Sequence, residues 1–136
     1  MKNNLCFITN IAPHYREPIF SLIDKEIGCD FYIGDHIHTK LKVFDYHILS
    51  GYRKTLKNRF IGPFYWQQGS VGLVFKPYKH YILDGEPFCL SSWIILLLCR
   101  LLGKKTIAWS HGWYGRESLL KGFIKKIFYK QFSMLM

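Results

Sequence analysis

Ionisable side chains follow three short apolar runs of the sequence, and they are the residues best suited to carry chemistry. They are His14, Arg16, Asp84, His111 and Arg116. An imidazole can exchange a proton near neutral pH, a guanidinium can grip a phosphate through two hydrogen bonds, and a carboxylate can hold a hydroxylated substrate. The set therefore suits a ligand that carries hydroxyl groups and an anionic group.

The richest stretch is 105–116, where an apolar run stops at a polar turn crowded with large residues. His111 is the candidate catalytic residue, because the end of a strand and the following Gly112 would expose it to substrate. The alternative is that His111 only caps the strand through hydrogen bonds. Trp113 could stack on a sugar ring or cover the edge of the sheet.

The other two turns supply candidate binding residues. Pro13, His14 and Arg16 lie between the first apolar run and the first predicted helix, whose N-terminus could receive an anion. Asp84 could hold a hydroxylated substrate, although an aspartate followed by Gly85 also makes an ordinary turn. Arg116 would add a second guanidinium beside the last helix.

Several common sites lack their signatures. The sequence has no G-x-G-x-x-G after the first strand, no P-loop and no G-x-S-x-G elbow. The four cysteines have no C-x-x-C spacing, so buried reduced thiols are expected and no metal site is predicted.

Alternating strand and helix patterns position these turns. Strands are expected at 5–9, 29–33, 80–83 and 106–109, with helices from Pro18 to Gly28 and from Pro87 to Gly103. This alternation predicts an α/β fold, a Rossmann-like open parallel sheet with helices on both faces. The carboxyl ends of parallel strands meet at one edge, so the three turns should line one crevice.

The remaining segments are less regular. A third strand is expected at 44–49, a solvated basic stretch at 53–59, and a loop or short extra strands at 60–75. A last helix, capped by Ser118, is expected to continue to the end of the chain. Its lysine-rich face could meet an anionic membrane surface, or the helix could simply pack on the sheet.

The composition is that of one globular domain of 136 residues, with 49% hydrophobic residues and a formal net charge of +10. The charge predicts anionic partners: phosphates, nucleic acid or a membrane surface. No secretory signal is evident, and the most apolar run, 93–99, is far shorter than the ~20 residues of a membrane-spanning helix. A cytoplasmic location, with possible peripheral contact with the membrane, is expected.

Three motifs, in this order and spacing, resemble the amino-terminal domain of GT-B glycosyltransferases of the family 4 type. The first is the loop 10–18 with its proline, tyrosine and arginine. The second is Asp84-Gly85-Glu86 followed by a leucine-rich helix, and the third is the histidine–glycine turn at 109–116. The resemblance covers nearly the whole chain.

The resemblance implies a retaining transfer of a sugar from a nucleotide-sugar donor to a glycan or lipid-linked acceptor, usually without a metal, as in polysaccharide biosynthesis. It would place His111 near the transferred sugar and its phosphates, with Pro13, His14 and Arg16 lining the cleft. In such enzymes a second domain holds the donor, commonly with an E-x7-E pair of glutamates.

That second domain is absent from 1–136, so the sequence predicts a truncated enzyme, an incomplete amino-terminal domain that is inactive alone unless a separately encoded donor domain joins it. Two alternatives stay open. One is a small basic nucleic-acid-binding module, which the aromatic content of 18% allows but the lack of a recognition motif disfavours. The other is a non-catalytic subunit that pairs with another chain through an exposed sheet edge.

Overall fold

The computed structural model describes residues 4–35, 42–62, 64–84, 89–109 and 134–135. In this part of the chain seven strands form one mixed sheet in the order β4-β3-β2-β1-β5-β6-β7. The strands are β1 Leu5–Thr9, β2 Asp30–Gly34, β3 Tyr52–Ile61, β4 Phe64–Gln68, β5 His80–Asp84, β6 Lys105–Trp109 and β7 Met134–Leu135. Neighbouring strands pair in parallel, except that β3 and β4 form an antiparallel hairpin.

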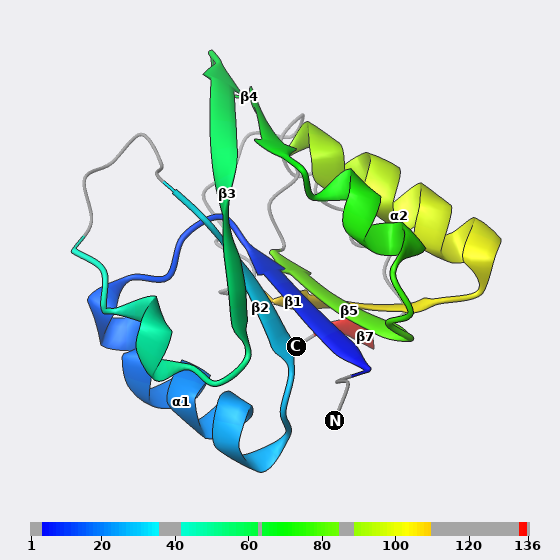
Figure 1. Cartoon of the computed structure of the whole chain (residues 1–136). Coiled ribbons are helices and arrows are strands. Elements are labelled where there is room, and N and C mark those ends of the chain that lie inside the picture. The colour runs from blue at the N-terminus through cyan, green and yellow to red at the C-terminus, as the bar shows by residue number, and fades with distance from the viewer. Residues whose placement is uncertain (1–3, 36–41, 63, 85–88, 110–133, 136) are drawn as a thin grey trace.

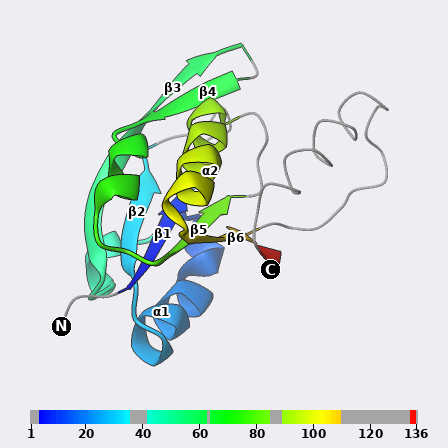
Figure 2. The same ribbon diagram turned by 90° about the vertical axis from the view of Figure 1, so that its right-hand side faces the viewer.

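Within the same described ranges, two α-helices and three 3-10 turns lie between these strands. The helices are α1 Glu17–Glu26 and α2 Leu90–Leu102, and the turns are η1 His14–Arg16, η2 Tyr46–Ile48 and η3 Val71–Phe75. Figure 1 shows the sheet lying between α1 and α2, and Figure 2 shows the β3–β4 hairpin at one extremity of the molecule. The α/β architecture with a mostly parallel sheet, expected from the alternating pattern, is confirmed.

The central strand β1 is buried on both faces, as its continuous apolar run predicts. Phe7 points to the α1 side, where its ring packs against Phe20 and Phe31 at centroid distances of 5.1 and 5.6 Å. Its neighbour Ile8 belongs to the second core cluster, on the α2 side, with Ile95. One apolar run therefore serves two cores.

The two helix ends predicted by glycines are both confirmed. Gly28, at φ 80°, donates its N–H to the Ile23 carbonyl at 2.9 Å, and Gly103 closes α2 in the left-handed region at φ 72°. Glycine adopts this conformation without the Cβ clash that other residues suffer. Pro18 stands in the first turn of α1, where its missing N–H costs nothing. Helix α2 begins at Leu90, three residues after the expected Pro87.

The prediction of a strand at 44–49 is wrong. This segment is a loop with the turn η2, because the Asp45 carboxylate accepts the His47 N–H at 3.0 Å and so stabilises a turn. The strand lies farther on, in the basic stretch, where no strand was expected. Its charged side chains are exposed as predicted, while Leu56 and Asn58 alternate inward at 2% exposure each.

The last helix was expected to continue to the chain end, and this is wrong for Met134–Leu135. These residues form β7 and pair in parallel with Ile107 and Ala108 of β6. A strand here satisfies backbone groups along the edge of β6 that a helix would leave unpaired within the sheet. Ser118 and most of that expected helix lie outside the described residues.

All four cysteines are buried free thiols, as predicted: Cys6, Cys29, Cys89 and Cys99. None of the described helices has the length and apolarity to cross a bilayer.

Candidate functional site

The carboxyl ends of β1 and β5 meet at a polar contact. Both oxygens of the Asp84 carboxylate accept hydrogen bonds, Oδ1 from the Thr9 hydroxyl at 2.9 Å and Oδ2 from the Asn10 backbone N–H in a short contact. The Thr9 hydroxyl also lies 3.2 Å from the Ile11 carbonyl, and its single proton can serve one acceptor at a time. Asp84 therefore anchors the first residues of the loop between β1 and α1.

Two buried amides from the β3–β4 hairpin hold the same loop from another direction. Asn58 Nδ2 donates to the Asn10 carbonyl at 2.9 Å, and Gln67 Nε2 donates to the Thr9 carbonyl at 2.8 Å. Asn58 and Gln67 are cross-strand partners in the hairpin and are 2% and 3% exposed. Buried side-chain N–H groups that donate to backbone carbonyls restrict the movement of the loop that carries those carbonyls.

Gly34, the last residue of β2, permits this close approach. A Cβ atom at Gly34 would lie 2.0 Å from the Asn10 carbonyl oxygen and 2.4 Å from Asn58 Nδ2. The next residue, Asp35, accepts the Asn58 backbone N–H at 2.9 Å. Strands β2, β3, β4 and β5 thus all contribute to the position of one loop at the end of β1.

Farther along, the loop is held against the segment that precedes η2. The backbone N–H of His14 donates to the Lys42 carbonyl at 2.7 Å, and Pro13, which is buried, bridges to Val43. The Tyr46 hydroxyl donates to the Ala12 carbonyl at 3.4 Å, and burial raises the pKa of Tyr46. These contacts with the segment 42–46 fix the backbone position of Pro13 and His14.

Three polar or aromatic side chains are displayed by the turn η1 that ends this loop. His14 and Tyr15 are exposed and Arg16 is half-buried; the Arg16 Cζ atom lies 5.7 Å from the centre of the Tyr15 ring. The His14 ring meets that of Tyr15 edge-on at 5.7 Å. This turn offers a guanidinium, an imidazole and an aromatic ring at the N-terminus of α1.

The hydrogen-bond partner of His14 determines its neutral tautomer. Nδ1 lies 3.1 Å from the Lys42 carbonyl oxygen, which can only accept, so Nδ1 carries the proton. In the neutral ring Nε2 then has the lone pair and can accept from a hydroxyl group. The Arg16 guanidinium can donate to an anion, although Glu17 places a carboxylate in the same first helical turn.

The structure therefore brings together part of the predicted site. Asp84 contacts the start of the loop that carries Pro13, His14 and Arg16, as the convergence of parallel strand ends predicts. The other four predicted site residues lie outside the described residues: His111, Gly112, Trp113 and Arg116. Trp109, at the end of β6, pairs with Asp84 in the sheet register.

Sequence reasoning missed the two amides that hold the loop. Asn58 lies in the stretch 53–59, for which the sequence predicts a solvated basic surface, and Gln67 lies in 60–75, for which it predicts a loop or short extra strands. The available signal was the alternation of Leu56 and Asn58 with charged residues, which is typical of a strand with one buried face.

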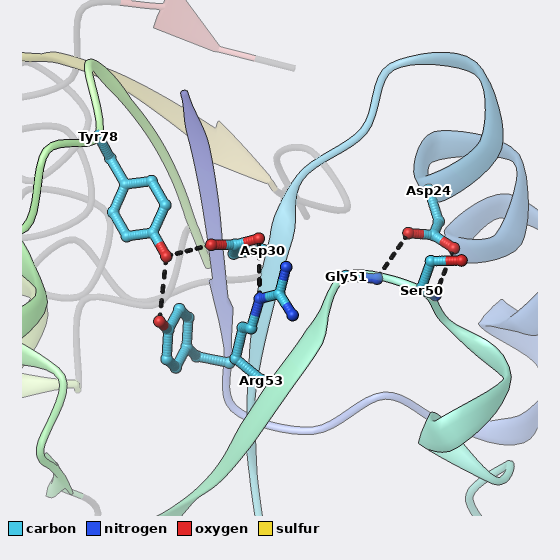
Figure 3. Close-up of polar contacts among 7 residues, drawn as sticks. Asp24, Asp30, Ser50, Gly51, Arg53 and Tyr78 are labelled. Carbon is cyan, nitrogen blue, oxygen red and sulfur yellow. Dashed lines mark hydrogen bonds and ion pairs between the residues drawn. The ribbon is translucent and has the colours of Figure 1, made fainter. Parts of the chain in front are cut away.

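A second polar cluster lies at the opposite, amino-terminal edge of the sheet (Figure 3). The Tyr78 hydroxyl donates to Asp30 Oδ2 in a short hydrogen bond, and Arg53 Nε lies 3.0 Å from Asp30 Oδ1. Because the Tyr78 proton is used by Asp30, the Tyr32 hydroxyl, 3.1 Å away, donates to Tyr78. Burial and the hydrogen bond to Asp30 raise the pKa of Tyr78.

This second cluster joins the starts of β2 and β3 to the residue two before β5, and both carboxylate oxygens of Asp30 and the hydroxyls of Tyr78 and Tyr32 take part in its contacts. A neighbouring contact joins α1 to the start of β3: Asp24 accepts the backbone N–H groups of Ser50 and Gly51 at 2.7 and 2.9 Å (Figure 3). Both contacts are best explained as structural.

Within the described ranges, no three or more histidine, cysteine or acidic side chains gather in a way that could hold a metal ion. No protein-family model matches the sequence, and neither the curated proteins nor the solved structures include a significant match.

Proposed function

We propose that this chain is the acceptor-side, Rossmann-like domain of a GT-B glycosyltransferase of the family 4 type. The complete enzyme would transfer a sugar from a nucleotide-sugar donor to a glycan or lipid-linked acceptor. The observation that carries the proposal is the strand order. With the antiparallel β4 set aside, the sheet reads β3-β2-β1-β5-β6-β7, which is the 3-2-1-4-5-6 order of doubly wound nucleotide-binding sheets.

In such sheets ligands bind outside the carboxyl ends of the strands, at the point where the strand order reverses. Here the order reverses between β1 and β5, where Thr9 and Asp84 meet. The loop that begins there carries His14 and Arg16. One fold hosts many activities, so the proposal also depends on these side chains and on the resemblance of their loop to the family.

Each residue has a proposed role. His14 accepts from an acceptor hydroxyl through Nε2, Arg16 binds a phosphate, and Asp84 keeps the loop in place rather than contacting substrate. The resemblance would give His111 a role near the transferred sugar, and Gly112, Trp113 and Arg116, which follow it in the sequence, would contribute to substrate binding.

The resemblance assigns donor binding, with its paired glutamates, to a second domain of such enzymes and acceptor binding to the domain that residues 1–136 resemble. Residues 1–136 are therefore proposed to bind acceptor without transferring sugar by themselves, on the cytoplasmic side of the membrane and without a resident metal.

Ligand-observed saturation-transfer NMR tests the binding role. The panel contains oligosaccharides and short-chain polyprenyl-phosphate saccharides. Arg16→Gln should weaken binding of the phosphate-bearing ligands by about tenfold or more, since a charge-assisted hydrogen bond contributes about 1.5–3 kcal/mol. His14→Ala should weaken saccharide binding, whereas the matched exposed controls His47→Ala and Arg100→Gln should not.

Two results would contradict the proposal. One is absence of saccharide binding together with tight binding of single-stranded RNA that weakens steeply with salt, which would favour a nucleic-acid-binding module. The other is transfer of radiolabelled sugar by residues 1–136 alone, which would show that no second domain is needed for the reaction.

A further inference from the structure

The β3–β4 hairpin has one buried face and one exposed face. The buried face carries the cross-strand pairs Asn58–Gln67 and Phe60–Tyr65, which pack toward the N-terminal end of α2. The opposite face, called here the outer face, consists of three further cross-strand pairs, and all six residues are exposed: Lys57, Arg59, Ile61, Phe64, Trp66 and Gln68.

The outer face stands beyond the body of the sheet. The last residue of β3 that pairs with β2 is Leu56, opposite Gly34, and residues 57–61 continue with β4 as partner. The hairpin therefore projects past the carboxyl edge of the sheet, as Figures 1 and 2 show. A projecting hairpin can touch a flat surface that the rest of the domain does not reach.

Polarity on the outer face changes in order from the tip inward. At the tip, Ile61 is 80% exposed and faces Phe64, which is 41% exposed. Next comes Arg59 opposite Trp66, which is 40% exposed, and then Lys57 opposite Gln68. The Arg59 Nε atom donates to Gln68 Oε1 at 2.9 Å, which holds the guanidinium along the face.

The charged side chains of the two hairpin strands are all basic. The seventeen residues from Tyr52 to Gln68 contain four basic residues and no acidic one. Of the four, Arg53 is paired with Asp30 at the far end of β3. Lys57 and Arg59 stand on the outer face close to the apolar tip, so an occupant of this face should be both anionic and apolar.

We propose that the outer face docks on an anionic lipid bilayer. The order of side chains matches the depth profile of a bilayer: apolar residues in the hydrocarbon boundary, tryptophan at the interface, and cations at the lipid phosphates. Single-stranded nucleic acid also binds surfaces on which cations lie beside aromatic rings, but its binding does not explain an exposed isoleucine at the tip. The bilayer accounts for all three pairs.

Docking in this way would bring the site loop close to the lipid surface, because Asn58 and Gln67, on the reverse of the same hairpin, hold the carbonyls of Asn10 and Thr9. An acceptor anchored in the membrane would then reach the loop. The docking proposal itself does not depend on the proposed glycosyl transfer, and vesicle binding measures it separately from saccharide binding.

Sedimentation of the full chain with sucrose-loaded vesicles tests the proposal, using phosphatidylcholine with and without phosphatidylglycerol. Wild type should bind the anionic vesicles and dissociate as salt is raised. Ile61→Ser should weaken binding by about tenfold or more, because the transfer of an isoleucine side chain from water into the bilayer strengthens binding by roughly that factor. Lys57→Gln/Arg59→Gln should weaken it by about fivefold for each cation removed.

Matched controls lie away from the hairpin. Ile27→Ser removes an isoleucine that is 67% exposed beyond the end of α1, and Lys79→Gln/Lys105→Gln removes two exposed charges at the amino-terminal edge of the sheet. Both controls should bind vesicles like wild type, and circular dichroism should show the same fold in every variant. Trp66→Phe should abolish the blue shift of tryptophan emission on vesicle addition.

Three outcomes would overturn the proposal. The first is no binding of wild type to anionic vesicles. The second is an equal loss of binding in Ile61→Ser and Ile27→Ser, which would mean that contact is not made by the hairpin. The third is binding of single-stranded RNA that depends on Arg59 and Trp66 but not on Ile61, which would assign the outer face to nucleic acid.

Discussion

Asp84, the last residue of β5, accepts a hydrogen bond at 2.9 Å from the hydroxyl of Thr9, the last residue of β1 and 75 positions earlier in the chain. The two strands are parallel neighbours, so their carboxyl ends lie side by side. The contact fixes the start of the loop that carries His14 and Arg16. Stability and site geometry are therefore linked at one carboxylate.

Asp84→Asn should lower the free energy of unfolding by about 1–3 kcal/mol, because hydrogen bonds to a charged group contribute more than those to a neutral one. An amide keeps the shape of the carboxylate but has one oxygen and no negative charge to accept from the Thr9 hydroxyl and the Asn10 N–H. Urea denaturation measures the change.

Asp45→Asn is the matched control for this substitution, because Asp45 is exposed and its carboxylate hydrogen-bonds within its own turn, to His47. Its effect should stay clearly below that of Asp84→Asn. Equal stability of Asp84→Asn and wild type would show that the carboxylate does not anchor the loop.

Gly34→Ala should be among the more damaging single-methyl additions. The new Cβ would lie 2.0 Å from the Asn10 carbonyl oxygen, a backbone atom that can move only if the loop moves. Overpacking of this kind typically costs about 1–3 kcal/mol or more. Thermal and urea unfolding measure the loss.

Gly72→Ala provides the comparison, since no atom lies within 4 Å of its added Cβ. At such a site alanine stabilises by about 0.4–1 kcal/mol, because it restricts the unfolded chain. If both variants had the same stability, the close approach of the loop to β2 would be refuted.

Tyr78→Phe should lower the free energy of unfolding by about 1–3 kcal/mol. The hydroxyl that would be lost donates to Asp30 and accepts from Tyr32, so both partners would lose a buried hydrogen bond. Tyr15→Phe, on a ring that is 59% exposed, should have little effect. A Tyr78→Phe protein as stable as wild type would indicate that water replaces the hydroxyl.

Alkaline pH should destabilise the fold through its buried thiols. Burial raises the pKa of Cys29 to about 12 and that of Cys99 to about 11, from 9.0. Above pH 9.0 the unfolded thiols lose protons that the folded thiols keep, so the unfolded state binds fewer protons and stability falls as pH rises. Each thiol contributes a slope of about 1.4 kcal/mol per pH unit in this window.

Urea denaturation under reducing conditions, at several pH values above 8.5 or so, measures this slope against the ordinary thiol pKa. Cys99→Ala should reduce the slope, and the remaining decline should come from Cys29, Cys6 and the buried tyrosines, whose pKa values burial also raises. A stability that is flat across the window would contradict the assignment of protonated buried thiols.

The local signals in the sequence determined the parts of the fold that depend on neighbouring residues. Glycines placed the ends of α1 and α2, because a left-handed residue is needed there. Apolar runs placed β1, β5 and β6, because a strand buried on both faces has few polar positions. From parallel strands alone, the end of β5 and the loop after β1 were predicted to share one edge, and Asp84 and Asn10 do.

Tertiary structure alone decided how that loop is held and where the third parallel strand lies. Asp45 favours a turn where the hydrophobic pattern favoured a strand, while the strand itself is a basic stretch whose buried face is only two residues wide. Asn58 and Gln67 look like surface residues in the sequence. They become buried loop anchors because the antiparallel pairing of β3 with β4 sets both opposite the end of β1, a contact between residues about fifty positions apart that no local pattern encodes.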